Sequence, residues 1–281
     1  MKRKTAVITG ASSGFGLLTA IELAKNGFYV LAAIRNLEKK QIILDFAKEN
    51  HVEQYIEIIE LDVASHPSIE QFRKNVNRFE RIEVLVNNAG YAQGGFAEEV
   101  TIEEYKLQFE TNFFGLIAVT QAVLPIMRKN TSGLIINMGS VSGQIGFPGL
   151  SPYVSSKFAL EGWSESLRLE VKPFGIDVVI IEPGSYSTNI WSAGKKVAPK
   201  SLQKDSPYFP YMLQLENELE KGGQKRGNPI GIAQQITYLV NHRGFRKLRY
   251  PMGKGIKSFI WLKKVLPWRL MEHLIMKRLD K

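Results

Sequence analysis

The sequence predicts a single α/β domain in which a doubly wound parallel sheet of about seven strands carries helices on both faces. Three observations lead to this prediction. Short runs rich in β-branched residues alternate with longer helical stretches, which is typical of parallel strands joined by helices. The run Val178-Val-Ile-Ile181 is apolar without alternation, as a strand covered on both faces is. A glycine-rich turn separates the first expected strand from the first expected helix.

The expected elements follow one another along the chain. Strands are expected at Thr5–Thr9, Phe28–Ala33, Tyr55–Leu61, Glu83–Val86, Gly133–Asn137 and Asp177–Ile181, with a seventh near Arg246–Tyr250. Helices are expected at Gly14–Lys25, Leu37–Glu49, Ser68–Phe79, Thr101–Met127 and Pro152–Val171. Residues 186–229 break this rhythm because they are rich in proline, glycine, lysine and aromatic residues. We interpret them as an insertion over a pocket within one domain spanning residues 1–281.

Composition excludes several classes of site. The 281 residues are 44% hydrophobic and 23% charged, as in an ordinary globular protein with a sizeable core. Cysteine is absent and the four histidines are scattered, so disulfides and thiolate sites are excluded and no metal is expected. The N-terminus shows no signal peptide, and no apolar run reaches the roughly 20 residues of a membrane span. We expect a cytoplasmic protein.

The positive charge is confined to the C-terminal segment. Residues 243–281 hold twelve Lys or Arg and two acidic residues, so they carry the whole net charge of +10. The rest of the chain is neutral, which argues against nucleic acid as a partner. This basic extension interleaves aromatic and aliphatic residues with its cations. It indicates either a peripheral contact with an anionic membrane, or helices that pack beside the pocket with their charges in solvent.

The glycine-rich turn is a candidate pyrophosphate site. It reads Thr9-Gly10-Ala-Ser12-Ser13-Gly14-Phe15-Gly16, with the spacing Gly-x-x-x-Gly-x-Gly. Glycines between a strand and a helix allow the backbone to approach a phosphate at the helix N-terminus. At the end of the next strand, Arg35 and Asn36 stand where a carboxylate would select the ribose of NAD(H). Arg35, with Ser13 as a second donor, favours NADP(H), and NAD(H) stays open as the alternative.

Two further strand ends carry candidate ligand-binding residues. Asn88, Ala89 and Gly90 follow the fourth strand, and Pro183, Gly184 and Thr188 follow the sixth. Strand carboxyl ends are where open α/β sheets bind ligands, although an ordinary turn would show the same residues. Asn112 lies inside the expected helix Thr101–Met127, where asparagine is a poor helix former. Either it is a tolerated polar residue, or the helix is interrupted there to hold a water or orient a lysine.

Tyr153 and Lys157 are the candidate proton-transfer pair. They lie four residues apart in the expected helix Pro152–Val171 and therefore share one helix face. An ammonium beside a phenol lowers a phenol pKa of about 10 towards neutrality. Such a phenol exchanges a proton with an alcohol or ketone. Ser140, just past a strand end, is a candidate donor to a substrate carbonyl oxygen. A Tyr-x-x-x-Lys pair alone arises by chance, so it depends on this context.

With these motifs in order, residues 4–185 resemble the short-chain dehydrogenase/reductase family. The resemblance implies a Rossmann-type sheet, with Tyr153 as general acid/base and Ser140 positioning the carbonyl. It also implies that Lys157 binds the nicotinamide ribose and lowers the Tyr153 pKa, and that Asn112 supports a water relay. Asp62, followed by Val63, would contact the adenine. The strand end at residues 33–36 looks like the NADPH-using hydroxysteroid and retinol dehydrogenase branch, and a homodimer or homotetramer is expected.

The substrate prediction rests on the insertion. Its large side chains include Tyr186, Trp191, Tyr208, Phe209, Tyr211 and Met212. They favour a bulky apolar alcohol or carbonyl, such as a steroid, a retinoid or a long-chain carbonyl. Alternatively, these side chains complete the core or a subunit interface. Two other functions stay open: a 3-oxoacyl-carrier-protein-type reductase, and a catalytically silent NADP(H)-binding regulator.

Overall fold

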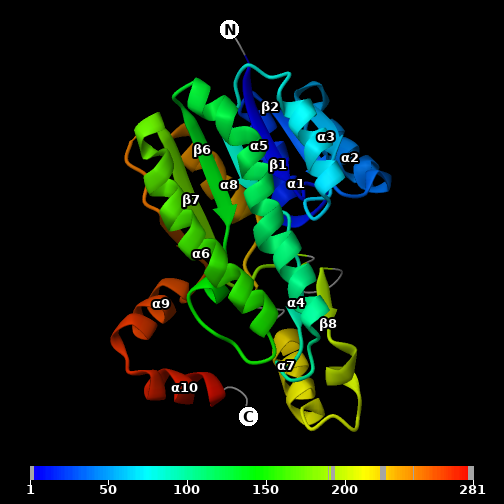
Figure 1. The fold of residues 1–281 in the computed structure, drawn as a ribbon, viewed down its shortest axis with the longest axis vertical. Helices are drawn as coiled ribbons and strands as arrows, with labels where there is room; N and C mark the ends of the chain where they lie inside the picture. Colours follow the sequence, from blue (N-terminus) through cyan, green and yellow to red (C-terminus); the bar gives the residue numbers. More distant parts are fainter. Residues whose placement is uncertain (1–2, 189, 191–193, 222–225, 243, 278–281) are drawn as a thin grey trace.

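The parallel sheet lies between two layers of helices (Figure 1). A computed structural model describes residues 3–188, 190, 194–221, 226–242 and 244–277. The seven strands of the main sheet are parallel in the order β3-β2-β1-β4-β6-β7-β9, so the predicted doubly wound fold is confirmed. The strands are β1 Lys4–Thr9, β2 Phe28–Ile34, β3 Ile56–Glu60, β4 Val84–Asn87, β6 Gly133–Met138, β7 Ile176–Pro183 and β9 Arg249–Met252.

The helices agree with the prediction best in the first two thirds of the chain. They are α1 Gly14–Lys25, α2 Lys40–Glu49, α3 His66–Val76, α4 Ile102–Phe109, α5 Gly115–Lys129, α6 Ser151–Val171, α7 Phe209–Lys221, α8 Ile230–Asn241, α9 Ile256–Val265 and α10 Trp268–Met276. The predicted helix at Thr101–Met127 is divided into α4 and α5 by a π-helical turn, Glu110–Phe114. Helices α7 and α8 were not predicted, and helices in the basic extension, where α9 and α10 lie, were only one of two interpretations of that segment.

Alternate strand residues supply two cores. Ala6 and Ile8 of β1 pack with α1 and α8 on one face, whereas Val7 packs with α3 and α5 on the other. Both sides of the central strands are therefore buried, which explains why their sequences lack in/out alternation. The sheet's carboxyl edge, towards the lower part of Figure 1, is left to the connecting loops. This edge holds the candidate site.

One helical stretch meets the length and composition criteria for a membrane span. The continuous stretch Ile102–Lys129 is long and apolar enough to cross a bilayer by length and composition alone, which the sequence analysis missed. Its α5 part packs Val119, Val123 and Met127 into the core against α3 and the sheet. These contacts are those of a core helix in a globular domain.

The insertion at residues 186–229 is tied to the body by a second, two-stranded parallel sheet. Strand β8, Lys195–Val197, pairs with β5, Ala92–Gly94, and neither strand was predicted. The buried carboxylate of Glu99 then accepts hydrogen bonds from Ser201 (2.6 Å) and Ser206 (2.5 Å). These contacts hold the described residues 195–206 of the insertion beside the carboxyl edge of the main sheet.

Candidate active site

The glycine-rich turn has the geometry of an anion site. Gly10 and Gly14 adopt φ values of +66° and +54°, a region that favours glycine. A Cβ on Gly16 would lie 2.4 Å from the Gly10 carbonyl oxygen, so only glycine fits there. The first turn of α1 contains no acidic residue, and Ser13 makes no side-chain capping bond. The positive end of the α1 dipole is thus presented to the pocket.

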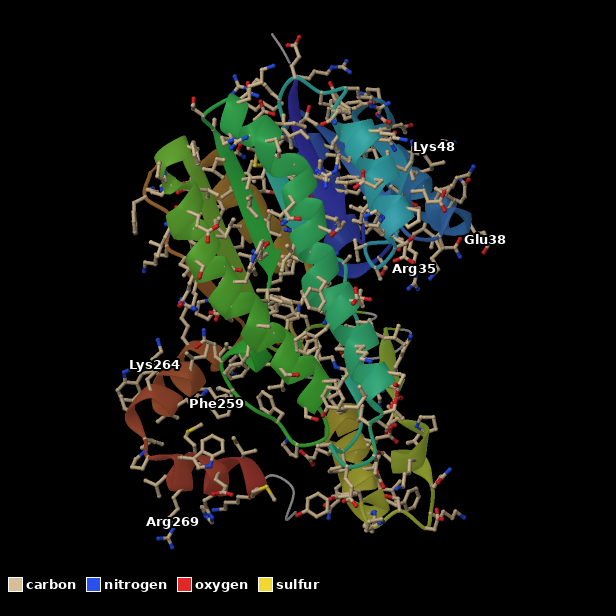
Figure 2. All side chains as sticks on the ribbon, viewed as in Figure 1. Arg35, Glu38, Lys48, Phe259, Lys264 and Arg269 are labelled. Atoms are coloured by element: carbon tan, nitrogen blue, oxygen red, sulfur yellow. The ribbon has the colours of Figure 1, made fainter. Side chains whose placement is uncertain are left out.

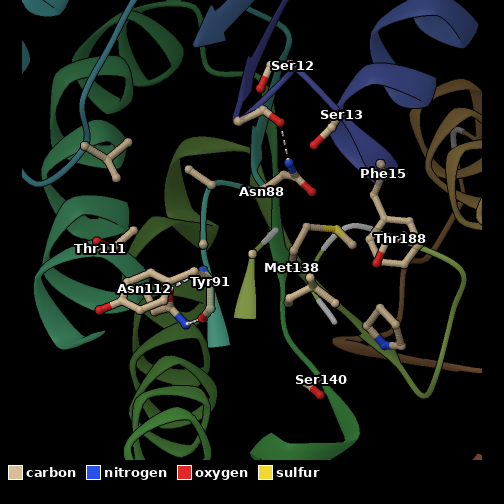
Figure 3. Close-up of a pocket in the computed structure, with 18 of the residues that line it drawn as sticks. Ser12, Ser13, Phe15, Asn88, Tyr91, Thr111, Asn112, Met138, Ser140 and Thr188 are labelled. Carbon is tan, nitrogen blue, oxygen red and sulfur yellow. Dashed lines mark hydrogen bonds between the residues drawn. The ribbon is translucent and has the colours of Figure 1, made fainter. Parts of the chain in front are cut away.

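Asn88 holds this turn in place. Its amide nitrogen donates to the carbonyl oxygens of Thr9 (2.9 Å) and Gly10 (3.1 Å). In return, the Thr9 hydroxyl accepts from the backbone amides of Asn88 and Ala89, both at 3.0 Å. Figure 3 shows Asn88 beside Ser12 and Ser13, with a hydrogen bond to the neighbouring backbone. The asparagine therefore joins the ends of β1 and β4.

Two cations border the pocket at the end of β2. Arg35, as predicted, and Lys39, which the sequence analysis overlooked, both line it. Asp62, after β3, also lines the pocket, and its carboxylate accepts from the Ala64 amide (3.0 Å). Asn36 does not line the pocket, since its side chain caps the following turn by accepting from the Glu38 amide (2.8 Å). Lys39 is the last residue of the 3-10 turn Leu37–Lys39 that follows the end of β2.

Asn112 occupies the π-helical turn that separates α4 from α5. The side chain is buried and pairs with the backbone of Tyr91, donating to its oxygen (3.0 Å) and accepting from its nitrogen (3.1 Å). It also lies 3.4 Å from the Ser156 hydroxyl of α6. π-Helical turns recur at functional sites. The predicted helix interruption is present, and here it fixes the loop after β4 against α6 (Figure 3).

Tyr153, Ser140 and Lys157 meet at the buried end of the pocket. Burial raises the pKa of Tyr153 to about 12, and a hydrogen bond with Ser140 opposes that rise. Burial lowers the pKa of Lys157 to about 8. The Lys157 ammonium donates to the Met138 carbonyl oxygen (2.6 Å) and lies 5.7 Å from the Tyr153 ring centroid. Burial therefore dominates the Tyr153 pKa in this arrangement, and the lowering expected from Lys157 stays a prediction.

One cavity of about 390 Å³ connects these features along the sheet edge. It is lined by every predicted site residue except Gly16 and Asn36: Gly10, Ser12, Ser13, Gly14, Phe15, Arg35, Asp62, Val63, Asn88, Ala89, Gly90, Asn112, Ser140, Tyr153, Lys157, Pro183, Gly184 and Thr188. Residues that the sequence analysis missed include Lys39, Tyr91, Met138 and Lys196. Lys196 belongs to β8 and lies over the Tyr91 ring at 4.8 Å, so the insertion closes one wall.

The predicted aromatic lining is only partly present. Tyr186 lines the cavity and packs edge-on against Phe15, with ring centroids 5.5 Å apart. Tyr208 instead stacks on Phe96 at 4.5 Å, and Tyr211 packs edge-on against the same ring. Trp191 lies outside the described residues. Tyr208 and Tyr211 therefore pack on Phe96 outside the cavity, with Tyr211 37% exposed, whereas Met212 is buried.

The residues present fit a dinucleotide cofactor. The cavity is lined by residues at the α1 N-terminus, by the cations after β2 and by Tyr153 and Ser140. Figure 3 shows Ser12 and Ser13 towards one end and Ser140 towards the other. An unsatisfied helix N-terminus suits a pyrophosphate, and a phenol beside a serine hydroxyl suits a carbonyl or alcohol. No cluster of three or more His, Asp or Glu that would hold a metal occurs among the described residues. Fold and site together define an α/β oxidoreductase that uses a nicotinamide cofactor.

The chain belongs to the short chain dehydrogenase family, whose sequence profile matches residues 4–197. It is 46% identical over 279 residues to the uncharacterized oxidoreductase YusZ of Bacillus subtilis, covering 99% of each chain. It is 40% identical to the 3-ketodihydrosphingosine reductase of Bacteroides thetaiotaomicron, covering 93% of this chain and 94% of that one. With human retinol dehydrogenase 8 the identity is 33%, over 85% of this chain and 78% of the relative.

Solved structures show the same architecture. A short-chain dehydrogenase from Streptomyces avermitilis superposes with a TM-score of 0.82 at 32% identity, covering 100% of this chain and 99% of that one. ElxO with NADP bound has a TM-score of 0.74 at 26% identity, covering 91% of this chain and 99% of ElxO.

Proposed function

We propose that this protein reduces a bulky, apolar ketone or aldehyde to an alcohol with NADPH. The observation that carries the proposal is the convergence of the buried Tyr153 phenol and Ser140 with the phosphate-binding turn in one cavity. The family relationship supports an oxidoreductase. The NADP bound to ElxO and the cations at the end of β2 support the choice of cofactor.

The residues around the cavity divide the work of the reaction. The turn from Gly10 to Gly16 and the α1 N-terminus hold the pyrophosphate, and Arg35 with Lys39 neutralises the 2′-phosphate. When bound, the cofactor supplies the hydride. Ser140 donates a hydrogen bond to the substrate carbonyl oxygen, and Tyr153 gives that oxygen its proton. A phenol pKa of about 12 keeps Tyr153 protonated at neutral pH, as a general acid must be.

Lys157 and Asn112 have supporting roles in this mechanism. The Lys157 ammonium holds the nicotinamide ribose and stabilises the phenolate that remains after proton transfer. Asn112 keeps the loop at Tyr91 against α6 and orients the water from which the proton returns. Both side chains are buried, which keeps their hydrogen bonds from competing with bulk solvent.

The apolar substrate class is supported by the cavity and by two relatives. Tyr186, Phe15 and Met138 give the cavity apolar walls. The names of two relatives state 3-ketodihydrosphingosine, a ketone on a long alkyl chain, and retinol as substrates.

We also infer that a second copy of the chain covers exposed apolar residues on α4, the π-helical turn and α6, which include Leu107, Phe114 and Leu169.

A carbonyl panel tests the function directly. We expect NADPH oxidation, followed at the nicotinamide absorbance, with long-chain or polycyclic ketones and at least tenfold lower kcat/KM with small polar ketones, or about 1.4 kcal/mol. An acyl-carrier-protein thioester is the matched competitor. Higher turnover of that thioester would favour the reductase of lipid synthesis, and no turnover of any carbonyl by protein that binds NADPH would favour a silent regulator.

The basic extension is proposed to bring the protein to an anionic membrane surface. Trp261, Val265 and Trp268 are 61%, 52% and 59% exposed, and Leu270 and Leu274 follow on α10. Exposed Lys257 and Arg269 accompany them. Figure 2 shows Arg269 projecting away from the body at the end of the molecule opposite Lys48. Tryptophan beside lysine and arginine is the composition of helices that lie in an anionic interface.

Vesicle sedimentation tests this contact. We expect binding to vesicles containing phosphatidylglycerol and none to phosphatidylcholine alone, with binding falling roughly tenfold or more in Lys257→Glu/Arg269→Glu, at about 1 kcal/mol per cation. Lys40→Glu/Lys48→Glu on α2 changes the net charge equally and is the control. Equal loss in both variants would indicate a general charge effect and contradict the proposal.

A further inference from the structure

Two carboxyl groups that the proposed reaction does not use are buried behind the site. Glu161 follows Lys157 by one turn of α6, and Glu182 is near the end of β7, just before Pro183. Their side chains are only 6% and 2% exposed. Buried carboxylates without full compensation are costly, so their presence requires an explanation.

One guanidinium is shared among these carboxyl groups. The Arg249 Nε lies 2.8 Å from Glu161 and 3.8 Å from Glu182, while another of its nitrogens bonds the more exposed Glu165 (2.5 Å). Glu182 also accepts from the Gln144 amide (2.7 Å). The remaining oxygen of Glu161, Oε1, receives no hydrogen bond from the described residues. Glu161 and Glu182 both approach the same Arg249 nitrogen, and a proton held between the two carboxyl groups would satisfy this oxygen.

The Glu161 side chain packs against the loop that carries Ser140. A Cβ on Gly143 would lie 2.9 Å from the Glu161 Cγ, and one on Gly139 would lie 3.2 Å from its Oε1. Glycines on both sides of Ser140 therefore let this loop rest on the Glu161 carboxyl group. Lys263 of α9 donates to the Gln144 carbonyl oxygen, which connects the C-terminal extension to the same loop.

We propose that Glu161 and Glu182 share one proton at neutral pH, and that their single remaining charge keeps Lys157 in its ammonium form and seats the Ser140 loop. Both are positioning residues, since they act through Lys157 and Ser140. Two neighbouring carboxyl groups in a buried site do not both ionise, because their like charges repel, as in carboxyl dyads elsewhere. This inference rests on the proposed function for its kinetic consequences, but not for the shared proton itself.

The charges around the pair determine the expected direction of a pH shift. Lys157 and Glu165 face it from α6, Arg249 from β9, and Lys264 from α9. Burial lowers the Lys157 pKa, and the charge on Glu161 raises it. Without Glu161, the single charge passes to Glu182, which does not contribute to the Lys157 pKa, so that pKa should fall further. Because the Tyr153 pKa is about 12, Lys157 is the group whose deprotonation would end activity as the pH rises.

Isosteric variants separate the two carboxyl groups. In Glu161→Gln, the basic limb of the kcat/KM profile for ketone reduction should move to lower pH by roughly one unit, a tenfold loss on that limb. In Glu182→Gln, the remaining Glu161 ionises freely, so the limb should stay or move to higher pH. Glu165→Gln removes an exposed partner of Arg249 and is the matched control, for which no shift is expected. Melting temperatures would identify variants that merely fold poorly.

A readout without turnover tests the shared proton. Infrared difference spectra of the wild type should show a protonated carboxyl stretch that persists above pH 6 and disappears in Glu161→Gln and in Glu182→Gln. Wild-type protein without this band, or equal limb shifts in Glu161→Gln and Glu165→Gln, would overturn the proposal. If the band is present while no ketone is reduced, the proposed function fails and the carboxyl pair stands.

Discussion

Tyr153→Phe is expected to lower ketone reduction by roughly 10²- to 10⁴-fold while cofactor binding is retained, the usual range for removing a general acid. The substitution deletes only the hydroxyl of a side chain that is 4% exposed, so its ring still fills the end of the cavity. Turnover would be followed at the nicotinamide absorbance. NADPH binding would be measured by the quenching of tryptophan fluorescence.

The matched control is Tyr105→Phe. The Tyr105 hydroxyl lies 2.6 Å from the Ser151 hydroxyl at the start of α6, so this variant also loses one tyrosine hydrogen bond near the site. Tyr105 does not line the cavity. Activity close to that of the wild type is expected. Equal losses in both variants, or an active Tyr153→Phe enzyme, would remove Tyr153 from the mechanism.

Arg35→Asp is expected to shift the preference between NADPH and NADH by roughly 100-fold or more towards NADH, or about 2.8 kcal/mol. The carboxylate would repel a 2′-phosphate and accept a hydrogen bond from a 2′-hydroxyl. Figure 2 places Arg35 at the lower end of the β2 side of the sheet, where the strands meet the cavity. The measurement is the ratio of kcat/KM values for the two cofactors with one ketone.

Two further variants interpret that ratio. Lys39→Asp should move the cofactor preference in the same direction by a smaller amount. Lys39 also lines the cavity, but it ends the 3-10 turn Leu37–Lys39 and so lies farther along the chain from the end of β2. Lys48→Asp, on the same side of the sheet but away from the cavity, should leave it unchanged. An unchanged ratio in Arg35→Asp would contradict the preference for NADPH.

Strand and helix order could be predicted because each element carries its own local signal. Helix α1 begins and ends where the sequence analysis placed it, since the glycine-rich turn leads into it, Lys25 ends it, and Asn26 and Gly27 follow it. The break near Asn112 was visible as a poor helix former in an apolar stretch. Motif order likewise indicated most residues of the cavity, because strand carboxyl ends of a parallel sheet meet at one edge.

Long-range packing could not be predicted in the same way. Tyr208 and Tyr211 look like pocket residues in the sequence, yet both pack on Phe96, more than 100 positions earlier in the chain. The strands β5 and β8 are too short to show periodicity, and they form only because they pair with each other. Lys196 reaches the cavity through that pairing.

The amino-acid pattern alone was sufficient for the doubly wound sheet, the glycine-rich turn and the Tyr153–Lys157 pair, because these depend on residues close together in the chain. Only the folded chain decided the environment of those groups. Burial raises the Tyr153 pKa, and the fold places the Met138 carbonyl oxygen where Lys157 donates to it. Three distant segments bring Glu161, Glu182 and Arg249 together behind these groups. Electrostatic energies depend on desolvation and on distances in space, which spacing along a sequence does not contain.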